Sequence, residues 1–244
     1  MTEARSGSGA ALEVDLAAKR FGDRLTLGAI RFSLSPGERV ALLGPSGTGK
    51  STLLAIAAGT DRDIEGHVAR GAGRLAMVFQ EPRLLPWRSL TDNIALIPGA
   101  GGPERARAAL VEVGLGAEAD AWPQKVSLGQ QRRAALARAL AVRPGLVLMD
   151  EPLVSLDAEN ASAMRALIRR VLDETGAAAL IATHDRAEAL ALADRVLVLG
   201  GRPAVLVADR RSPLDRTART EASTVEAAVA PFFSGLESGV LFDA

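Results

Sequence analysis

The segment Gly44-Pro45-Ser46-Gly47-Thr48-Gly49-Lys50-Ser51 decides the fold of this chain of 244 residues. It fits the pattern G-x-x-x-x-G-K-[ST], in which a glycine-rich loop wraps closely around a phosphate group. The apolar run Val40–Leu43 before it predicts a buried strand, and Ser51–Ala58 after it predicts a helix that ends at Gly59. Because this strand–loop–helix context is what the pattern requires, the segment predicts a nucleotide site rather than a chance glycine-rich turn.

The loop also predicts how the phosphates are held. Its glycines let successive backbone N–H groups point at the anion, and the following helix adds the positive end of its dipole. Lys50 is expected to reach the β- and γ-phosphates, and the Ser51 hydroxyl is expected to ligate Mg²⁺.

Composition limits the classes of protein that fit. The chain is 48% hydrophobic and 24% charged, with a formal net charge of zero. A dedicated nucleic-acid binder would carry excess Lys and Arg, so no nucleic-acid partner is expected. There is no cysteine, which excludes disulfides and thiolate chemistry. The polar N-terminus lacks the apolar core of a signal peptide, and no apolar stretch is long enough to cross a bilayer, so we expect a cytosolic protein.

Hydrophobic patterning predicts an α/β domain with two additions. Alternation in Leu12–Leu16 and strand-like residues from Leu25 to Leu34 predict an antiparallel sheet near the N-terminus. The segment from about 83 to 141 has helical periodicity and no clear strand, so it predicts an inserted helical lobe. The expected divisions are a flexible stretch 1–10, a main domain 11–208 and a short helical tail 209–244.

Two acids and a histidine follow buried strands of this domain. Leu146–Met149 predicts one strand and is followed by Asp150-Glu151, and Ala177–Thr183 predicts another and is followed by His184. Ligands bind at the carboxyl edge of parallel strands, so Asp150 is expected near Mg²⁺ and Glu151 near an attacking water. The alternative to a catalytic role for Asp150 and Glu151 is a pair of solvated acids in a loop. For His184, the alternative is a packed or solvated side chain.

Further elements complete the domain. A helix is predicted from Ala158 to Thr175, ending at Gly176, and another from Gln131 to Leu140. The segment Ser127–Gln130 leads into the second helix and forms another potential anion-binding end. The remaining interpretations are a terminal hairpin of Val196–Leu199 and Ala204–Ala208, and a structural His67 on a sheet edge.

With these pieces in order, the chain from about Leu12 to Ala208 resembles the nucleotide-binding subunits of ATP-binding-cassette (ABC) transporters. The resemblance implies a P-loop NTPase fold with a RecA-like parallel sheet core, and hydrolysis of ATP with Mg²⁺. It identifies Gly44–Ser51 as Walker A, Val147–Asp150 with Glu151 as Walker B and the catalytic glutamate, Gln80 as the Q-loop, Ser155–Asp157 as the D-loop, His184 as the switch histidine and Phe21 as the adenine-stacking aromatic.

The resemblance implies three groups of site residues. Glu151, His184 and Gln80 are the expected catalytic residues, and Ser51, Gln80 and Asp150 are the expected metal-site residues. For Phe21, stacking on adenine and packing in a core are equally good readings of the residue alone. The expected ATP-binding residues are Phe21, Gly44, Pro45, Ser46, Gly47, Thr48, Gly49, Lys50, Ser51, Thr52, Ser127, Gly129, Gln130 and Asp157.

One segment departs from the family pattern. The family signature reads L-S-G-G-Q, whereas this chain has Val126-Ser127-Leu128-Gly129-Gln130. If the backbone required a positive φ at Leu128, the side chain would cost on the order of 1–2 kcal/mol. We therefore expect a working but weaker site, and Leu128→Gly is expected to raise ATP turnover.

The resemblance also implies partners. Two subunits, most simply identical, are expected to face head to tail with ATP between Walker A of one and the signature of the other, on the cytoplasmic face of a membrane permease that a solute-binding protein serves. The run Phe79–Ser89 with Asp92–Leu96 is similar to the nitrate, sulfonate and taurine importer branch. Trp87 is expected either in the groove for a permease helix or as packing within the helical lobe.

Three other classes of protein share parts of this pattern. A soluble cassette ATPase is the nearest alternative, but it would need a second cassette, a coiled coil or a basic arm. A small-molecule P-loop kinase has no use for Ser127–Gln130 or His184. A purely structural subunit would be expected to lose Lys50 or Glu151, which are both present.

Overall fold

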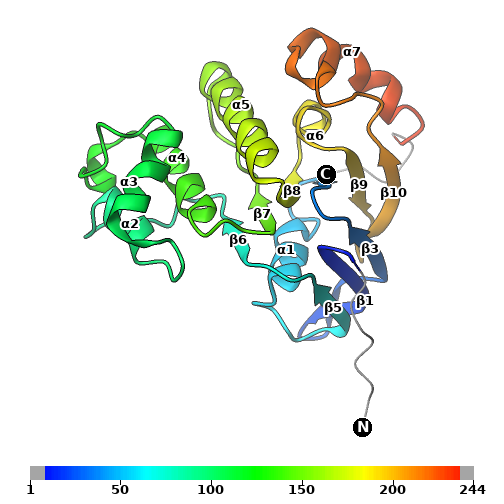
Figure 1. Ribbon diagram of the computed structural model, residues 1–244. Coiled ribbons are helices and arrows are strands. Elements are labelled where there is room, and N and C mark those ends of the chain that lie inside the picture. The colour runs from blue at the N-terminus through cyan, green and yellow to red at the C-terminus, as the bar shows by residue number, and fades with distance from the viewer. Residues whose placement is uncertain (1–8, 237–244) are drawn as a thin grey trace.

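The computed structural model describes residues 9–236, which form a central sheet with helices on both faces, a smaller sheet below it and a helical lobe at one side (Figure 1). The expected flexible stretch 1–10 therefore lies almost wholly outside the described residues, as do residues 237–244 of the expected tail. Within the described part of the chain, no helix combines the length and the apolar character that crossing a membrane requires.

The main sheet confirms the predicted parallel core. Its strands lie in the order β10-β9-β4-β8-β7-β6, and every neighbouring pair is parallel except β9 and β10. Strands β4, β7 and β8 are buried along their whole length, which is why each has an apolar run with a polar residue only at one end. The strand bounds are β4 (Arg39–Leu43), β6 (Leu75–Val78), β7 (Leu146–Asp150), β8 (Ala178–Thr183), β9 (Arg195–Gly200) and β10 (Val205–Arg211).

The smaller sheet is antiparallel, as the N-terminal pattern predicts. Its strands are β1 (Leu12–Phe21), β2 (Arg24–Leu27), β3 (Ile30–Leu34) and β5 (Glu65–Arg70), and β1 pairs with each of the others. The strand-like stretch expected from Leu25 to Leu34 is in fact two strands, because the ladder is interrupted at Gly28, whose N–H bonds instead to Ala204 O at 2.8 Å. His67 lies in β5 opposite Asp15 and away from the carboxyl edge of the main sheet.

Helices cover the two faces of the main sheet. Helix α1 (Lys50–Ala58) lies between the two sheets, and its Leu53, Leu54 and Ile56 are buried against both. Helix α5 (Ala158–Thr175) has the predicted bounds and packs Met164 and Ile168 on the opposite face, while Gly176 ends it with φ 64°. Helix α6 (Arg186–Leu192), which the sequence reading did not predict, covers β4 and β9 together with α7 (Ala222–Phe233).

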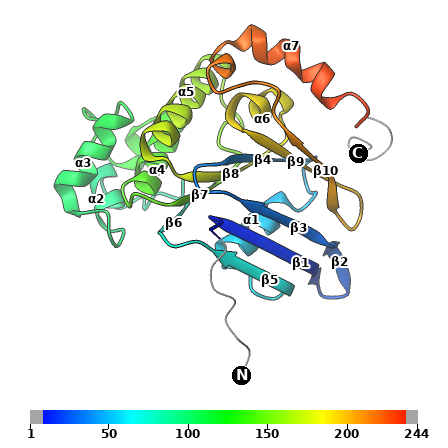
Figure 2. The same ribbon diagram turned by 45° about the vertical axis from the view of Figure 1, so that its right-hand side comes forward.

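The helical lobe is inserted between β6 and β7. It contains α2 (Leu90–Ala95), α3 (Gly102–Glu112), a 3₁₀ turn (Pro123–Lys125) and α4 (Leu128–Leu140), and Figure 2 shows it beside the β6 edge of the sheet. The lobe has its own core, in which Leu90 and Leu110 are fully buried. Helix α4 also packs against the main domain through residues on its other side, so it joins the lobe to the sheet.

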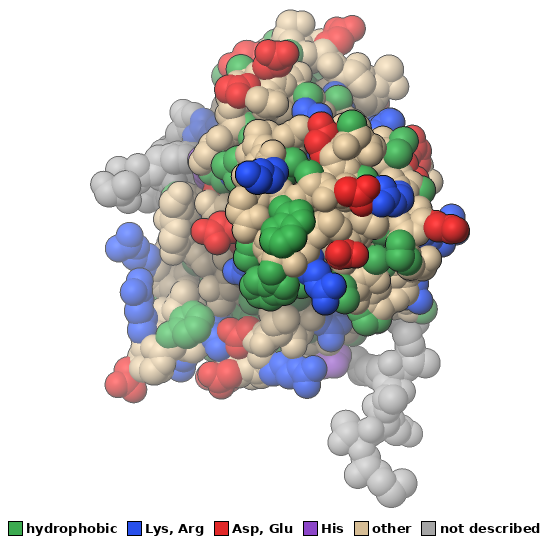
Figure 3. Space-filling view, turned by 90° about the vertical axis from the view of Figure 1, so that its left-hand side faces the viewer, with side chains coloured by type: hydrophobic (Ala, Val, Ile, Leu, Met, Phe, Trp, Pro, Cys, Tyr) green, Lys and Arg blue, Asp and Glu red, His purple; other side chains and the backbone are tan. Residues whose placement is uncertain are grey.

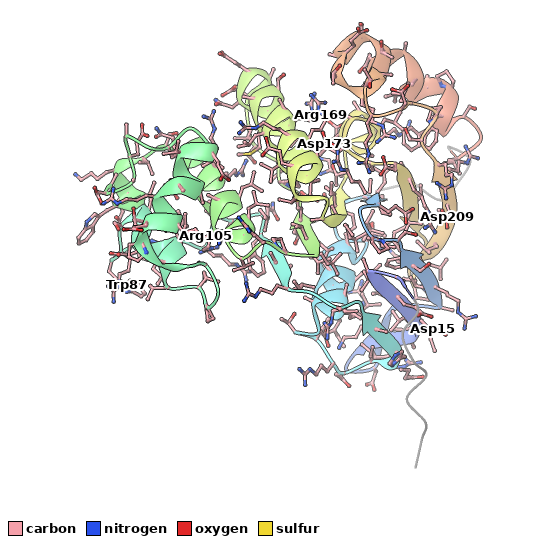
Figure 4. All side chains as sticks on the ribbon, in the orientation of Figure 1. Asp15, Trp87, Arg105, Arg169, Asp173 and Asp209 are labelled. Carbon is pink, nitrogen blue, oxygen red and sulfur yellow. The ribbon has the colours of Figure 1, made fainter. Side chains whose placement is uncertain are left out.

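The C-terminal segment is tied to the main domain by ion pairs. Asp194, at the start of β9, accepts hydrogen bonds from Arg216 at 2.7 Å and from the buried Arg219 at 2.7 Å. Asp173, labelled in Figure 4 on α5, accepts a bond of 2.6 Å from the buried Arg39 of β4. The terminal hairpin is present, but its second strand runs to Arg211 rather than ending at Ala208, so the expected division at residue 208 falls inside a strand.

Candidate nucleotide site

The loop between β4 and α1 has the backbone that an anion-binding loop requires. Gly47 and Gly49 have φ of 76° and 103°, in the region that L side chains rarely adopt. Close packing also requires glycine at positions 44 and 49. A Cβ on Gly44 would lie 2.9 Å from Leu199 O, and one on Gly49 would lie 2.6 Å from Cδ2 of Leu27. The loop is therefore wedged between β9 and β2 and cannot carry side chains at these points.

Lys50 points back along this loop. The side chain is 4% exposed, and Nζ donates to Gly44 O at 2.8 Å and to Pro45 O at 3.0 Å. Thr48 Oγ1 donates to the same Pro45 oxygen at 2.6 Å, which tightens the turn. Lys50 Nζ also lies 3.4 Å from Oε1 of Glu151. The positive charge is thus held at the loop by backbone oxygens and faces the carboxylate that follows β7.

Asp150 ends β7 and is almost fully buried, with 8% of its surface exposed. Burial raises the pKa of Asp150, and the charge of Glu151 acts in the same direction, whereas a hydrogen bond with Ser51 and the charges of Lys50 and Arg83 lower it. Its Oδ1 atom has no hydrogen-bond partner. A buried carboxylate oxygen of this kind, beside the Ser51 hydroxyl, fits the oxygen-rich surroundings that Mg²⁺ prefers. No group of three or more His, Cys, Asp or Glu residues that could hold a metal occurs within residues 9–236, so phosphate oxygens would have to complete such a shell.

Glu151 has a backbone conformation that sequence reasoning did not anticipate. Its φ is 46°, a left-handed value for a residue that is not glycine, and its N–H bonds to Ala182 O of β8 at 2.9 Å. Such a conformation costs on the order of 1–2 kcal/mol and persists where the surrounding structure demands it. The turn aims the Glu151 carboxylate back over the sheet edge, between the Lys50 amine and the His184 ring.

The structure brings His184 to the same point from the next strand. The register pairs Asp150 of β7 with Ala182 of β8, so the residues that follow the two strands leave the sheet side by side. Nδ1 of His184 lies 3.4 Å from Oε2 of Glu151, and the ring is about half exposed. Lys50, Glu151 and His184, predicted separately from three segments, therefore form one cluster.

Two other expected residues lie farther out. Gln80 follows β6, whose register pairs Val78 with Met149, so Gln80 leaves the sheet at the same edge as Asp150 and its side chain is exposed. Phe21 ends β1 and is 54% exposed, with the Lys19 amine 4.7 Å from the ring centroid. An exposed ring excludes the core-packing alternative for Phe21.

The signature segment begins α4 with a capping box. Ser127 Oγ accepts from Gln130 N at 3.2 Å, and Gln130 Oε1 accepts from Ser127 N at 2.9 Å. Asp157 caps α5 in a similar way by accepting from Asn160 N at 2.9 Å. These contacts place the exposed Ser127 and the half-buried Gly129 and Gln130 at a helix start outside the Lys50 cluster.

Leu128 does not have the positive φ that would have strained its backbone. Leu128 is the first residue of α4 and is not among the residues with positive φ, so the expected backbone strain is absent. The side chain is 47% exposed at the helix start. Any cost of this departure from the family pattern must come from the volume of the isobutyl group rather than from the backbone.

Sequence reasoning missed several groups that support the cluster. The buried Glu188 of α6 accepts a hydrogen bond from Thr183, the residue before His184, at 2.6 Å. Arg138 of α4 donates to the carbonyls of Pro82 at 2.8 Å and Arg83 at 2.7 Å, just after Gln80. The D-x-x-E spacing of Asp185 and Glu188 after a buried strand was the signal that could have revealed the first of these.

Comparison with known proteins identifies the class that this site defines. The pattern of the family described as ABC transporter matches residues 27–154, which include Walker A, Gln80, the signature segment and the Asp150–Glu151 pair. The chain belongs to the ABC transporter family, as one of its ATP-binding, ATP-hydrolysing chains.

Individual proteins of the family are similar to most of this chain. An aliphatic sulfonates import ATP-binding protein SsuB of Burkholderia ambifaria is 44% identical over 227 residues, which cover 91% of this chain and 70% of the relative. A protein with the same description from Paracoccus denitrificans is 46% identical, over 78% of each chain. A third, from Streptomyces avermitilis, is 46% identical over 81% of this chain and 76% of the relative.

Solved structures resemble the chain as well. The ATP-binding cassette MJ0796, described as a post-hydrolysis dimer bound to ADP and phosphate, superposes with a TM-score of 0.73 and is 25% identical, covering 84% of this chain and 100% of that one. An inward-facing ABC transporter described as a metal-chelate type gives a TM-score of 0.74 at 25% identity, over 83% and 84% of the two chains. Both confirm the predicted P-loop NTPase fold.

Proposed function

We propose that this chain is the ATP-hydrolysing subunit of an ABC importer, that two copies close over two ATP molecules, and that their opening and closing drives solute uptake through a membrane permease. The observation that carries the proposal is the cluster at the carboxyl edge of the main sheet, where Glu151 lies 3.4 Å from both Lys50 Nζ and His184 Nδ1. A carboxylate held between a lysine of a phosphate loop and a histidine suits the activation of water beside a γ-phosphate.

The hydrolytic step follows from these positions. Lys50, drawn to the loop by two carbonyl oxygens, is placed to bind the β- and γ-phosphates. The Glu151 carboxylate accepts a proton from a water molecule as the water oxygen bonds to the γ-phosphorus. The bond from the γ-phosphorus to its bridging oxygen breaks, and ADP leaves with the electron pair. His184 contacts the γ-phosphate and keeps Glu151 oriented through the contact of 3.4 Å.

Mg²⁺ would be held by the Ser51 hydroxyl, with the carboxylate of Asp150 and the amide of Gln80 beside it. When bound, it neutralises charge on the β- and γ-phosphate oxygens. The unpartnered Oδ1 of Asp150 supports this assignment, because a buried carboxylate oxygen needs a donor or a cation's water shell.

A dimer is proposed because a single chain does not bring its signature segment to its own Lys50 cluster, so that its ATP site is incomplete. The exposed Ser127 and the half-buried Gly129 and Gln130 lie at a helix start away from the Lys50 cluster of their own chain. In a head-to-tail pair, this segment closes over the γ-phosphate of the partner, and Asp157 lies next to the same interface. A two-fold arrangement then gives two equivalent sites. ATP favours closure because the second copy adds contacts to the γ-phosphate, and hydrolysis removes them.

The helical lobe carries the surface for the permease. Figure 3 shows the face of the lobe turned away from the main sheet, with apolar side chains gathered among charged ones. Trp87, labelled at the outer edge of the lobe in Figure 4, is 64% exposed, which favours the groove interpretation over packing inside the lobe. Besides Leu128 of the signature segment, the exposed large apolar residues of the lobe are Trp87, Leu96, Ile97, Val111 and Trp122. An apolar surface of this kind suits a helix of a permease on the cytoplasmic face of the membrane.

The relatives named for aliphatic sulfonate import support a small organic sulfonate as the solute, with nitrate and taurine as related candidates. The test is to reconstitute the chain with a sulfonate-importer permease and measure ATP turnover. An importer subunit is stimulated by the matching binding protein loaded with a sulfonate. A turnover that is high in the isolated subunit and unchanged by permease and binding protein would favour a soluble ABC-type ATPase.

A further inference from the structure

The residues on either side of His184 are held by a closed set of hydrogen bonds. Thr183 Oγ1 donates to Glu188 Oε2 at 2.6 Å and accepts from Asp185 N at 3.0 Å. The Asp185 carboxylate in turn accepts from Glu188 N at 2.9 Å. Three hydrogen bonds among Thr183, Asp185 and Glu188 therefore restrain the backbone on both sides of His184.

The burial of this set shows that it is built into the fold. Thr183 is 1% exposed and Glu188 is 6% exposed, whereas the ring of His184 between them is about half exposed. Glu188 is a costly residue to bury, because a carboxyl group inside a protein must be hydrogen-bonded or neutral. Its second oxygen, Oε1, has no hydrogen-bond partner. Packing alone would be served better by an apolar side chain of similar volume.

We infer that Glu188 is a positioning residue: it holds Thr183 and Asp185 so that the exposed ring of His184 stays within reach of Glu151. The inference deepens the proposed function and rests on it only for its catalytic consequence. The histidine needs such support because it follows the last residue of β8 and about half of its side chain is exposed. A displacement of about 1 Å at such a position can reduce a rate by roughly 100-fold.

The chain offers an unusual way to test this placement directly. His67 and His184 are its only histidines. In a sample labelled at histidine, NMR should show two imidazole signals, which a His67→Gln variant would assign. His67 lies in β5 of the other sheet and serves as an internal reference for the fold.

The variants separate a positioning role from a general structural one. Glu188→Leu removes the acceptor, and Thr183→Val removes the hydroxyl at nearly constant volume. We expect each to shift or broaden the His184 signal while leaving His67 in place, and to lower kcat roughly 10- to 100-fold with KM for ATP changed less than about threefold. The double variant should be no worse than the worse single one, because the two residues act as a unit. Glu188→Gln and Thr183→Ser keep the bond and should restore the His184 signal and most of kcat.

The matched control is Glu226→Gln, an exposed glutamate on α7. If Thr183→Val, folded as judged by His67, leaves the His184 signal and kcat as in wild type, the inference is wrong. A shift of both histidine signals together would also overturn it, because that result indicates a global role. Should the wild-type chain fail to hydrolyse ATP, the proposed function fails, yet the His184 signal still reports whether Glu188 positions the ring.

Discussion

Oε2 of Glu151 lies 3.4 Å from Nδ1 of His184, although the two residues are 33 positions apart in the chain. The contact exists because β7 and β8 are parallel neighbours in register, so both strands deliver their next residue to one edge. The positive φ of Glu151 completes it by turning the carboxylate inward. Sheet geometry thus positions the proposed base and its proposed orienting partner.

The first prediction concerns Glu151→Gln. The amide cannot accept the proton of the attacking water, so we expect the hydrolysis rate to fall by about 10²- to 10⁴-fold with little loss of ATP affinity. Single-turnover hydrolysis and equilibrium binding of ATP with Mg²⁺ measure the two effects, and Glu226→Gln serves as the control. Normal hydrolysis by the variant would show that Glu151 is not the base.

The second prediction is a dependence of stability on pH. Burial raises the pKa of Glu188 to about 7 from its ordinary value of 4.5; Asp185 and Glu151 add to the rise, and Thr183 and Arg165 oppose it. The folded state therefore binds the proton more tightly than the unfolded state. This contribution to stability is fully present below pH 4.5 and is lost as the pH rises through about 7.

The Glu188→Gln variant isolates that contribution. Relative to the variant, the wild type should lose about 3 kcal/mol of unfolding free energy between the two pH values. Urea denaturation of both proteins at each pH gives the difference, in which the contributions of groups common to both proteins cancel. A difference that is the same at both pH values would contradict the assignment.

The third prediction concerns the C-terminal segment. Burial by itself would raise the pKa of Asp194, but hydrogen bonds from Arg216, Arg219 and the Arg39 backbone outweigh it and lower the pKa to about 2. Its stabilising effect is present above the ordinary value of 3.8 and is lost as the pH falls through about 2. At pH 7, Asp194→Asn should therefore destabilise the protein by about 1–3 kcal/mol, because the buried Arg219 loses its anion.

Thermal unfolding at neutral pH measures this loss. Asp209→Asn is the matched control, because Asp209 forms a pair with Arg195 but is more exposed, and it should cost less than about 1 kcal/mol. Equal losses in the two variants would show that the Asp194 cluster has no special role.

The sequence predicted those elements whose structure depends on residues close together in the chain. The loop at Gly44–Ser51, the bounds of α5 and the strands that end at Asp150 and Thr183 all follow from spacing and apolar runs. The left-handed Glu151 could not be predicted, because its conformation depends on a bond to Ala182 in another strand. The proposed role of Glu188 could not be predicted for a different reason. Helix α6 is short, and its apolar residues gave no separate helical signal.

The fourth prediction revises the expectation for Leu128. Because Leu128 has no positive φ, removing its Cβ relieves no backbone strain. If the isobutyl group hinders closure, Leu128→Ala and Leu128→Gly should raise ATP turnover by a similar factor, since both remove the isopropyl group that makes up most of the side-chain volume. Steady-state turnover of the two variants tests this. A gain for glycine alone would restore the backbone explanation, and no gain for either would show that the side chain is tolerated in the closed site.

The most direct test of the whole account is the mass of the Glu151→Gln variant in solution, measured by light scattering or sedimentation with ATP and Mg²⁺ and then with ADP. The account predicts a dimer with ATP and a monomer with ADP, because only the γ-phosphate is bound from both sides. A variant that binds ATP yet remains monomeric, both alone and in complex with its permease, would contradict it.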